Sequence, residues 1–194
     1  MIVLASASET RLKMLQGAGI GAKARPARID EQAIRLSLVT KKAGVVALAL
    51  ADAKARQVSA EWPDAIIIGC DQVLEHGGAI LGKAENRYQA RKQLISLRGD
   101  WHELVSAVTL YQGGTRIWQH ADKARLKMRL FSDAFLDDYL QRNWNEARHS
   151  VGCYQLEHEG VRLFSAIEGN FFTILGLPLV PLLNFLAGRG IILS

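Results

Sequence analysis

Asp71 is the residue whose setting most strongly suggests chemistry. It follows the apolar run Ile66-Ile-Ile-Gly-Cys70, so we expect it at the carboxyl end of a buried strand, where ligand sites of open α/β sheets lie. We expect the segment Gln72-Val-Leu74 to continue this strand, and a carboxylate inside an apolar run needs a partner to offset its desolvation. A carboxylate there can bind a divalent cation or orient a water molecule for attack. The alternative interpretation is an aspartate that opens a turn.

Two lysines can bring positive charge to this carboxylate. Lys54 lies on an Ala-rich helix expected over residues 42–60, directly before the Asp71 strand. Lys83 follows a Gly77-Gly78 turn, and pairing of residues 66–74 with 79–82 would bring it back towards Asp71. Two lysines and an arginine near one carboxylate suit a triphosphate with a metal ion, although either lysine alone is more often a solvated surface residue.

The turn from Ser6 to Arg11 is a candidate phosphate site. A strand over residues 2–5 runs into a helix that extends to about Gly17, and Ser6-Ala-Ser-Glu9 is a capping-box pattern. A helix N-terminus presents backbone N–H groups and the positive end of the helix dipole. The hydroxyls of Ser6 and Ser8 and the guanidinium of Arg11 would complete the site. Plain capping is the alternative, and for such a turn alone it is the commoner one.

Further acidic residues could share a metal ion with Asp71. The pair Asp30-Glu31 follows Ile29, and Glu168 precedes Gly169. Their alternative interpretation is as loop carboxylates, and spacing alone does not choose between the two. The five histidines show no zinc spacing, and no base is paired in sequence with Cys70, so a small buried side chain is the simpler interpretation of that cysteine.

Length and composition indicate one ordinary globular domain over residues 1–194. Hydrophobic residues make up 49% and charged residues 22%, and 24 basic against 19 acidic residues leave a net charge of +5. That charge fits anionic ligands without implying nucleic acid. Two cysteines are too few for a disulfide scaffold, which favours a cytoplasmic location.

Neither apolar segment of the chain suggests a membrane protein. The N-terminal stretch of residues 1–7 has no preceding basic region and is too short for a signal peptide. Residues 171–187 include Thr173, two prolines and Asn184, and we expect them to form a buried strand followed by a core helix.

The remaining patterns predict a mixed α/β sheet. Helices are expected over residues 88–97, 132–142 and 178–186, and strands over 104–111, 116–120 and 123–130. A further hairpin is expected around His158-Glu-Gly160. Residues 123–130 alternate basic and apolar side chains, which is typical of a half-exposed strand. Its basic face could bind nucleic acid, but a solvated or subunit-facing strand is the simpler interpretation because no aromatic residues interleave.

Taken together, these segments resemble the Maf family of nucleoside triphosphate pyrophosphatases. The resemblance runs nearly end to end, and each segment is weakly specific alone while their joint order is highly specific. It implies an elongated mixed β-sheet flanked by helices, with two lobes around a central nucleotide cleft as in inosine-triphosphatase-like proteins, and a homodimer. The segments that carry it are Leu4-Ala-Ser-Ala-Ser8 with Arg11, Ile29-Asp-Glu31, Ala51-Asp-Ala-Lys-Ala55, Ile67-Ile-Gly-Cys-Asp-Gln-Val73, Leu81-Gly-Lys83, Gly99 with His102, Gly152-Cys-Tyr154, Glu168-Gly169 and Leu175-Gly-Leu-Pro-Leu179.

The resemblance also implies a reaction and roles for residues. Members of the family hydrolyse nucleoside triphosphates between the α- and β-phosphates, giving the monophosphate and pyrophosphate, with Mg²⁺ or Mn²⁺, and clear unwanted nucleotides from the cytoplasm. Asp71 would be the general base or metal-linked carboxylate, with Glu31 as its partner at the metal. The residues that would hold the phosphates are Lys54, Lys83, Ser6, Ser8 and Arg11. Nucleotide is the expected partner, without stable nucleic acid or membrane.

Three positions bear on the preferred base: Thr10, Gln72 and Glu157. The branch of the family that acts on 7-methyl-GTP tends to have Trp, Gln and Glu there, and the branch that acts on dTTP and UTP tends to have Arg, Thr and Gln. A carboxylate at Glu157 would favour the cationic 7-methylguanine, and Gln72 could hydrogen-bond the base edge, although Thr10 cannot stack on a purine as Trp would. We therefore expect 7-methyl-GTP or another modified nucleotide. The alternatives are dTTP or UTP, or a deaminated purine such as inosine triphosphate.

The sequence also departs from the family pattern. Glu9-Thr10 stands where Pro and a large or basic residue are common, Ala84 replaces a Pro, and His149-Ser150 stands where many members have Asp-Lys. These departures bear on substrate preference more than on the reaction. A second interpretation is a non-catalytic nucleotide-sensing or nucleic-acid-binding regulator of cell division. Asp71 together with its cationic candidates favours the enzyme, because a pure binding protein has no need of that carboxylate.

Overall fold

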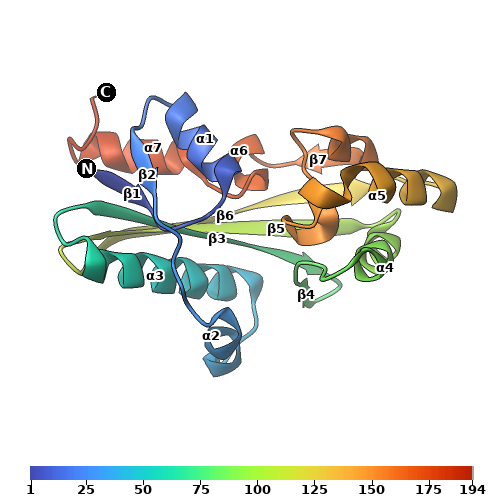
Figure 1. Cartoon of the computed structure of the whole chain (residues 1–194), viewed down its shortest axis with the longest axis horizontal. Helices are drawn as coiled ribbons and strands as arrows, with labels where there is room; N and C mark the ends of the chain where they lie inside the picture. The colour runs from blue at the N-terminus through green and yellow to red at the C-terminus, as the bar shows by residue number, and fades with distance from the viewer. Residues whose placement is uncertain (194) are drawn as a thin grey trace. The chain divides into compact units, whose positions relative to one another are not determined.

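Three long strands make up the middle of the sheet in this computed structural model, which describes residues 1–193. Those residues form a seven-stranded mixed sheet, drawn in Figure 1, in the order β2-β1-β3-β5-β6-β7, with β4 paired to β3. β1 is parallel to β2 and to β3, whereas β4 and β7 pair antiparallel with their neighbours. The mixed α/β sheet predicted from the sequence is therefore confirmed. The strands are β1 (Ile2–Leu4), β2 (Ala22–Ala24), β3 (Ile66–His76), β4 (Ala79–Leu81), β5 (Trp101–Gln112), β6 (Thr115–Met128) and β7 (Phe164–Glu168).

Helices connect the strands and follow the last of them. They are α1 (Glu9–Gly17), α2 (Glu31–Ser37), α3 (Ala43–Glu61), α4 (Arg87–Leu97), α5 (Asp133–Ala147), α6 (Phe171–Ile174) and α7 (Leu179–Gly188), with two short 3₁₀ helices, η1 (Val151–Cys153) and η2 (Glu159–Leu163). Among the described residues, no helix combines the length and the apolar character that crossing a membrane requires.

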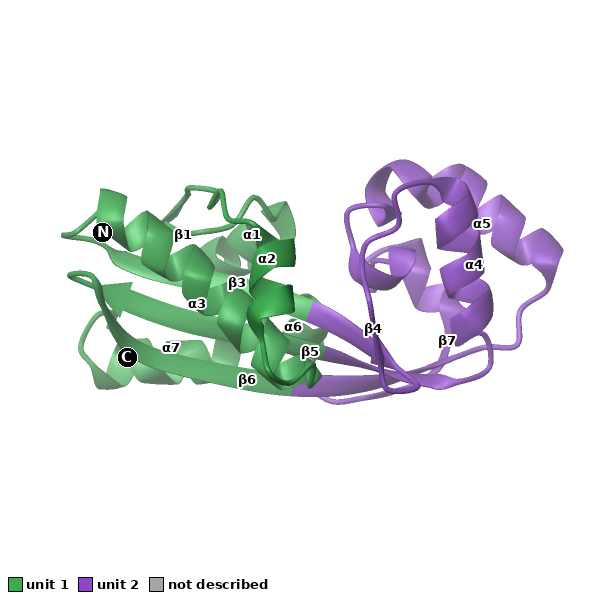
Figure 2. Cartoon of the chain, turned by 90° about the horizontal axis from the view of Figure 1, so that it is seen from below, with its two compact units in different colours: residues 1–72, 105–122, 171–194 green, residues 73–104, 123–170 purple. Residues whose placement is uncertain are grey.

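The chain divides into two compact units, coloured separately in Figure 2. The first unit contains residues 1–72, 105–122 and those from 171 onward, and the second contains residues 73–104 and 123–170. β3, β5 and β6 each contribute residues to both units, so each unit is built from separate stretches of the chain.

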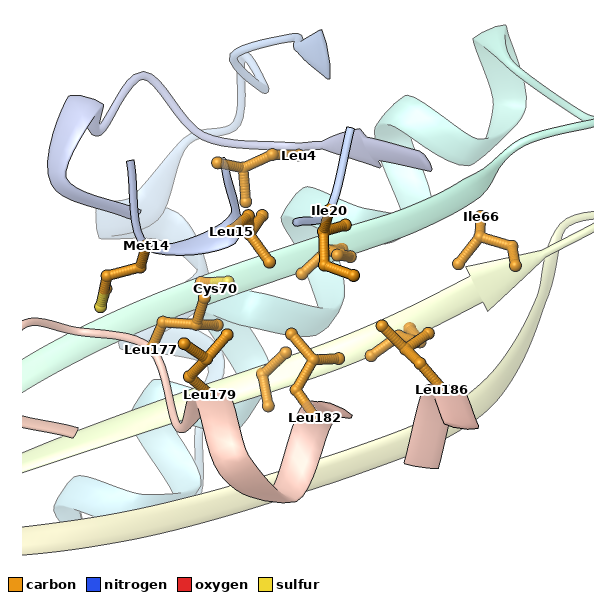
Figure 3. Packing of buried hydrophobic residues seen from close by; sticks show 13 residues of the cluster. Leu4, Met14, Leu15, Ile20, Ile66, Cys70, Leu177, Leu179, Leu182 and Leu186 are labelled. Carbon is orange, nitrogen blue, oxygen red and sulfur yellow. The ribbon is translucent and has the colours of Figure 1, made fainter. Parts of the chain in front are cut away.

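In the first unit, helices cover both faces of the sheet (Figure 1). Successive side chains of a strand point to opposite faces, so Ile66, Ile68 and Cys70 of β3 pack in the core on the side of α1 and α7. Figure 3 shows this cluster, in which Leu179 and Leu182 of α7 face β3. Ile67 lies on the other face with Val58 of α3. The apolar run 66–70 is thus buried on both faces, as its composition predicts.

Gly69 brings α3 unusually close to β3. A Cβ atom at Gly69 would lie 2.2 Å from the carbonyl oxygen of Ala51 and 2.7 Å from the Cβ of Ala55, both on α3. Only glycine fits this spacing, and the alanines on the facing side of the helix serve the same close packing. The approach matters because Lys54 lies between these two alanines on α3.

The second unit has a core built around a buried histidine. His102 of β5 is 2% exposed, and its Nε2 lies 2.7 Å from the hydroxyl of Tyr154. Tyr154 in turn packs edge-on against Phe164, and Gly152 adopts φ 76° where a Cβ would lie 2.6 Å from Leu74 and Tyr154. The Gly99–His102 and Gly152–Tyr154 motifs are therefore the two halves of one packing arrangement.

Two predictions about the last third of the chain were wrong. Residues 159–163 form η2 and not part of a hairpin, because the chain folds tightly here: Val161 N–H donates to the carbonyl of His158 and a Cβ at Gly160 would lie 2.4 Å from the carbonyl oxygen of Gln155. Residues 171–174 form α6 and not a buried strand, since an apolar run this short has no periodicity that separates strand from helix.

The two strands expected over residues 116–120 and 123–130 are a single strand, β6, which is joined to β5 by a Gly113-Gly114 turn.

The close approach at Gly69 yields a stability prediction. Gly69→Ala forces α3 away from β3, and we expect the free energy of unfolding in urea to fall by about 1–3 kcal/mol. The matched control is Gly44→Ala, near the start of α3, where an added Cβ meets nothing within 4 Å. That control should raise the free energy of unfolding by about 0.5–1 kcal/mol, because alanine is the better helix former. Equal changes in the two variants would contradict the close-packing interpretation.

The buried His102 predicts a pH dependence of stability. Burial lowers the pKa of His102 from 6.5 to about 4, with the nearby His76 adding to the shift. Between these values the unfolded chain binds a proton that the folded chain does not, so stability is fully present above pH 6.5 and is lost as the pH falls towards 4. The shift corresponds to about 3 kcal/mol.

This contribution can be isolated by comparison with His102→Gln. The variant should be less stable at pH 7, because Tyr154 loses its ring partner, but its free energy of unfolding should change less between pH 7 and pH 4 than that of the wild type. Urea titrations at each pH measure both quantities. Parallel curves for the two proteins would rule out this assignment.

Candidate active site

Asp71 lies inside β3 and not at its carboxyl end. β3 continues five residues further to His76, so the expected continuation of the strand through residues 72–74 is confirmed, and the placement of Asp71 at the carboxyl end was wrong. Asp71 nevertheless lies close to the point where the parallel pairing of β1 with β3 ends. Leu4, the last residue of β1, pairs with Ile68 of β3. Beyond that pair, the chain leaves β1 through the turn at residues 5–8. Asp71 therefore lies just past the carboxyl end of its parallel neighbour, where α/β sheets place ligands.

Lys54 and Asp71 form a buried ion pair. Asp71 is 6% exposed, and Nζ of Lys54 lies 2.6 Å from its Oδ1. The side chain of Lys54 is itself only 14% exposed. The proximity expected from the sequence order, helix before strand, is thus present, and Gly69 two residues upstream of Asp71 accounts for the short distance between the backbones.

Glu31 joins the same lysine from α2. Its Oε1 lies 2.8 Å from Nζ of Lys54, so one ammonium group bridges two carboxylates. Asp30, the other member of the acidic pair, caps α2 instead: its Oδ1 accepts a hydrogen bond from the N–H of Ala33 at 2.9 Å. The two residues of the acidic pair therefore have different roles. Asp30 is a structural helix cap, whereas Glu31 lies beside Lys54 and Asp71. We call these three residues, Glu31, Lys54 and Asp71, the acid–lysine cluster.

Burial dominates the electrostatics of the cluster. Desolvation raises the pKa of Asp71 above its usual value, while the positive charges of Lys54 and Arg11 act against the shift. The second carboxylate oxygen, Oδ2, is buried and has no hydrogen-bond partner among the described residues. Such an atom is costly to leave unpaired and is available to a ligand or a water molecule. The neighbouring Cys70 thiol is also buried, which raises its pKa to about 11 and keeps it protonated.

Arg11 ties three segments of the first unit together. Its Nε donates to the carbonyl of Gly176 at 2.8 Å, and its Nη1 lies 3.3 Å from the carbonyl of Cys70 and 3.4 Å from Oγ of Ser6. Gly176 has φ 96°, and a Cβ there would lie 3.0 Å from the guanidinium. Arg11 thereby holds its charge beside the peptide that precedes Asp71.

Ser8, and not Ser6, caps α1. Ser8 is the N-cap of α1, accepting from the N–H of Arg11 at 3.3 Å, so the prediction that the helix starts at Ser6 was wrong. Ser6 Oγ accepts instead from the N–H of Ser8 at 3.2 Å and from Arg11. Both hydroxyls and the guanidinium lie at the N-terminal end of α1, an arrangement that attracts anions.

Gln72 faces the opposite side of the sheet from Asp71. Its Nε2 donates to Oγ of Ser106 at 3.0 Å and to the carbonyls of Thr173 at 3.1 Å and Ile174 at 2.9 Å. Carbonyl oxygens only accept, so the amide nitrogen must point at α6 and the amide oxygen away from it. A ligand can therefore use Gln72 only as an acceptor.

Sequence reasoning missed the residues that orient Gln72. Ser106 is fully buried and donates to the carbonyl of Thr173 at 2.7 Å, while Oγ1 of Thr173 donates to Oδ2 of Asp122 at 2.6 Å. A signal was present in the strand expected over 104–111, where Ser106 interrupts an apolar run and requires a partner.

The other predicted site residues are spread over both units. Thr10 lies in the first turn of α1, in the first unit. Lys83 and Glu157 belong to the second unit. Lys83 is two residues past Leu81, which pairs with Leu74, and Glu157 lies in the exposed turn between η1 and η2. The β3–β4 hairpin is therefore confirmed, but the pairing predicted for residues 66–74 with 79–82 was wrong, because residues 74–76 are the ones that pair with 79–81.

Two further candidates have structural partners in the second unit. Glu168 of β7 belongs to the second unit and pairs with Arg125 at 3.2 Å. On the basic face of β6, Lys123 and Arg125 both pair with Glu103, and Arg125 also covers the ring of Trp101. Half of the basic face is thus neutralised, which favours the solvated-strand interpretation over nucleic acid.

The acidic groups suit a metal ion that is shared with a ligand. Among the residues that the structure describes, no group of three or more His, Cys, Asp or Glu side chains is placed to hold a metal ion. Asp71 and Glu31 offer two carboxylates, one with a buried unpaired oxygen. Mg²⁺ is commonly held by one or two carboxylates with waters and substrate phosphates, so the donor set fits an ion that is completed by a nucleotide.

Comparison with known proteins gives close relatives over nearly the whole length. A nucleoside triphosphate pyrophosphatase of Roseobacter denitrificans is 48% identical over 97% of this chain and 96% of the relative. A 7-methyl-GTP pyrophosphatase of Rhizobium meliloti is 43% identical over 99% of this chain and 98% of the relative. Among solved structures, a HAM1 protein from Coxiella burnetii covers 67% of this chain and 73% of its own, with 14% identity and a TM-score of 0.45.

The family itself follows from a match along the chain. Residues 1–189 match the family model described as Maf-like protein, which includes every residue of the acid–lysine cluster and of the Ser6–Arg11 turn. The resemblance stated from the motifs is confirmed. This chain belongs to the Maf family.

Proposed function

We propose that this protein is a nucleoside triphosphate pyrophosphatase, which hydrolyses the bond between the α- and β-phosphates to give a nucleoside monophosphate and pyrophosphate. The observation that carries the proposal is the acid–lysine cluster beside the N-terminus of α1: a buried carboxylate with one unpaired oxygen next to two cations. The names of close relatives, all pyrophosphatases, support the same reaction.

In this proposal, Asp71 accepts the proton of the attacking water. The water oxygen bonds to a phosphorus of the α–β bridge, the bridging P–O bond breaks, and the water proton passes to the carboxylate. Burial raises the pKa of Asp71, which makes it a better proton acceptor, while the ammonium group of Lys54 at 2.6 Å acts in the opposite direction and favours its ionised form. The unpaired Oδ2 is the oxygen that can take the water.

Positive groups neutralise the charge that develops on the leaving pyrophosphate. We assign this task to Lys54 and Arg11, with Ser6 and Ser8 donating hydrogen bonds to phosphate oxygens, and the resemblance to the family implies the same task for Lys83. Arg11 is already ordered by Gly176 and Cys70, so little entropy is lost when a phosphate binds. Charge placed in advance where it is needed is a large term in enzymatic catalysis.

A divalent cation fits the same place. We propose that Asp71 and Glu31 hold Mg²⁺ or Mn²⁺ together with the phosphates of the nucleotide. When bound, the ion supplies further neutralisation of phosphate charge. Because Lys54 now bridges the two carboxylates, binding of the ion requires that its ammonium group turns towards the phosphates.

For the base, we propose 7-methyl-GTP as the preferred substrate, with dTTP or UTP as the alternative within the family. The orientation of Gln72 supports a base that offers an N–H donor, which guanine does at its N1 and N2 positions. Glu157 would add a favourable charge for the cationic 7-methylguanine. Two of the relatives carry this substrate in their names, in Rhizobium meliloti and Bartonella henselae.

We further propose that the enzyme works in the cytoplasm as a homodimer. Cys70 and Cys153 are both free and buried, which fits a reducing compartment. The homodimer rests on the resemblance to the family.

Turnover by an Asp71→Asn variant tests the reaction. The variant keeps the shape of the side chain but cannot accept a proton, so we expect release of pyrophosphate to fall by about 10³-fold. The assay contains Mg²⁺ or Mn²⁺ with dTTP, UTP, CTP, GTP, ITP or 7-methyl-GTP, and EDTA-treated samples are the metal-free control. The matched variant is Asp52→Asn, a carboxylate of α3 that pairs with Tyr111 and Arg116, which should retain turnover.

A wild-type protein that binds nucleotides but releases no pyrophosphate would contradict the proposal and favour the non-catalytic sensor. Release of pyrophosphate that is equal in the wild type and in Asp71→Asn would contradict the role of the carboxylate.

Glu157→Gln tests the base preference. Removing the charge while keeping the size should lower kcat/KM for 7-methyl-GTP about tenfold relative to GTP, because the cationic base loses its counter-charge. The value for GTP is the internal control. An unchanged ratio would remove Glu157 from the base site and leave the pyrophosphatase reaction untouched.

A further inference from the structure

The second unit contains a cavity that the proposed function does not use. Its volume is about 450 Å³, within the range of small-molecule sites. Its walls come from the segment that joins β6 to α5, from the first turn of α5 and from η2. The lining residues are Arg129, Leu130, Phe131, Ser132, Phe135 and Arg162. We call this cavity the Arg–Phe pocket.

The Arg–Phe pocket carries positive charge that the protein does not neutralise. Within the part of the chain that the structure describes, the Arg129 side chain has no hydrogen bond or ion pair. Arg162 pairs with Oε1 of Glu159 at 2.7 Å, but the same oxygen also accepts from Arg142 at 2.6 Å. Arg142 is also paired with Asp138, so Asp138 and Glu159 together balance Arg142 and Arg162, and among the described residues Arg129 is the positive charge that remains without a counter-charge.

The acidic group closest in sequence is already committed. Asp133 begins α5 next to the pocket residue Ser132, and its carboxylate pairs with Arg98 at 2.8 Å and Arg91 at 3.1 Å. It therefore does not cancel the charge of Arg129. The N-terminus of α5, a helix of 15 residues, adds the positive end of its dipole on the same side as Ser132.

The rest of the lining is apolar and aromatic. Leu130 is 87% exposed, which is unusual for a residue of its size, while Phe131 is buried under the guanidinium of Arg98. The guanidinium carbon of Arg162 lies over the ring of Phe135, 5.2 Å from the ring centroid. A guanidinium over an aromatic ring, together with an exposed leucine, forms a surface on which a planar ring can lie.

Both halves of this description fit one class of ligand. An anionic group suits Arg129 and the start of α5, and a planar aromatic group suits Leu130 and the Arg162–Phe135 pair. We propose that the Arg–Phe pocket binds a nucleoside monophosphate, with the phosphate at Arg129 and the base against Phe135 and Leu130. The lining belongs to the second unit alone, whereas Asp71, Lys54 and Glu31 belong to the first, so this proposal stands independently of the proposed function.

Photolabelling of the full-length protein with 8-azido-GMP locates the site. Trypsin cleaves after Arg129 and Arg142, so the peptide 130–142 contains Phe131, Ser132 and Phe135. We expect this peptide to be labelled, and labelling to be suppressed by unlabelled GMP. Labelling confined to peptides of the first unit would overturn the proposal.

Calorimetric titration of GMP measures the contribution of each half. Arg129→Glu should weaken binding at the Arg–Phe pocket at least about tenfold, and Arg148→Ala, an exposed arginine at the C-terminal end of α5, should leave it unchanged. Phe135→Leu should weaken the binding of GMP but not of inorganic phosphate, because only the nucleotide has a ring to stack. Circular dichroism checks that each variant is folded. If Phe135→Leu does not fold, the result for Arg129→Glu alone decides the test.

The variant Lys54→Met distinguishes binding of GMP at the Arg–Phe pocket from binding at the active site. We expect this variant to lose turnover, while its peptide 130–142 is still labelled. If Lys54→Met removes all GMP binding, the pocket has no site of its own and the proposal fails. If turnover is normal and GMP binding is unaffected by Arg129→Glu, the proposed function stands and the pocket proposal fails.

Discussion

The buried ion pair between Lys54 and Asp71 is the interaction on which the rest of the first unit depends. A carboxylate that is 6% exposed in the middle of an apolar strand is costly unless a cation lies beside it. Lys54 supplies that cation from the facing helix, at a distance where the strand has no side chain at Gly69 and the helix has small ones at Ala51 and Ala55. The Ala-rich composition of α3 and the glycine of β3 are thus both conditions for one contact.

The alternation of β3 gives adjacent residues different tasks. Asp71 faces α3 and its lysine, whereas Gln72 faces α6 and is held by two backbone carbonyls. Arg11 reaches across the end of β1 to the peptide that precedes Asp71, so the strand is supported from both sides at this point. A segment of three residues, from Cys70 to Gln72, therefore receives contacts from α1, α3, β5 and α6, and little freedom is left to its backbone or its side chains.

The sequence was most informative where patterns are long. The helix expected over 42–60 is α3, and the apolar run before Asp71 is buried on both faces, because periodicity over ten or more residues identifies an element and its buried side. Short segments were not predictable in the same way. Ser6 and Ser8 are both able to cap a helix, and the sequence does not show that Ser8 is the cap while Ser6 accepts from the N–H of Ser8 and from Arg11.

The contacts of the candidate site that join distant segments of the chain could not be predicted from the sequence. Lys54 beside Asp71 follows from their order in the chain, but the approach of Glu31 depends on a connection with no periodic pattern. The bonds from Gln72 to Thr173 and Ile174 join residues about a hundred positions apart, and no spacing rule predicts them.

The helix that carries Glu31, α2, buries very little of its surface. None of the seven residues of α2 is buried. Leu36 within this helix and Val39 just after it are largely exposed, whereas Lys54 and Asp71 belong to packed elements. Segments that bury little apolar surface open at the lowest free energy. The three members of the cluster therefore differ in how firmly they are held: Asp71 and Lys54 belong to packed elements, whereas Glu31 lies on a helix that can open locally without opening the core. Exchange of solvent and ligand at Asp71 can then take place on the timescale of local opening and does not need global unfolding.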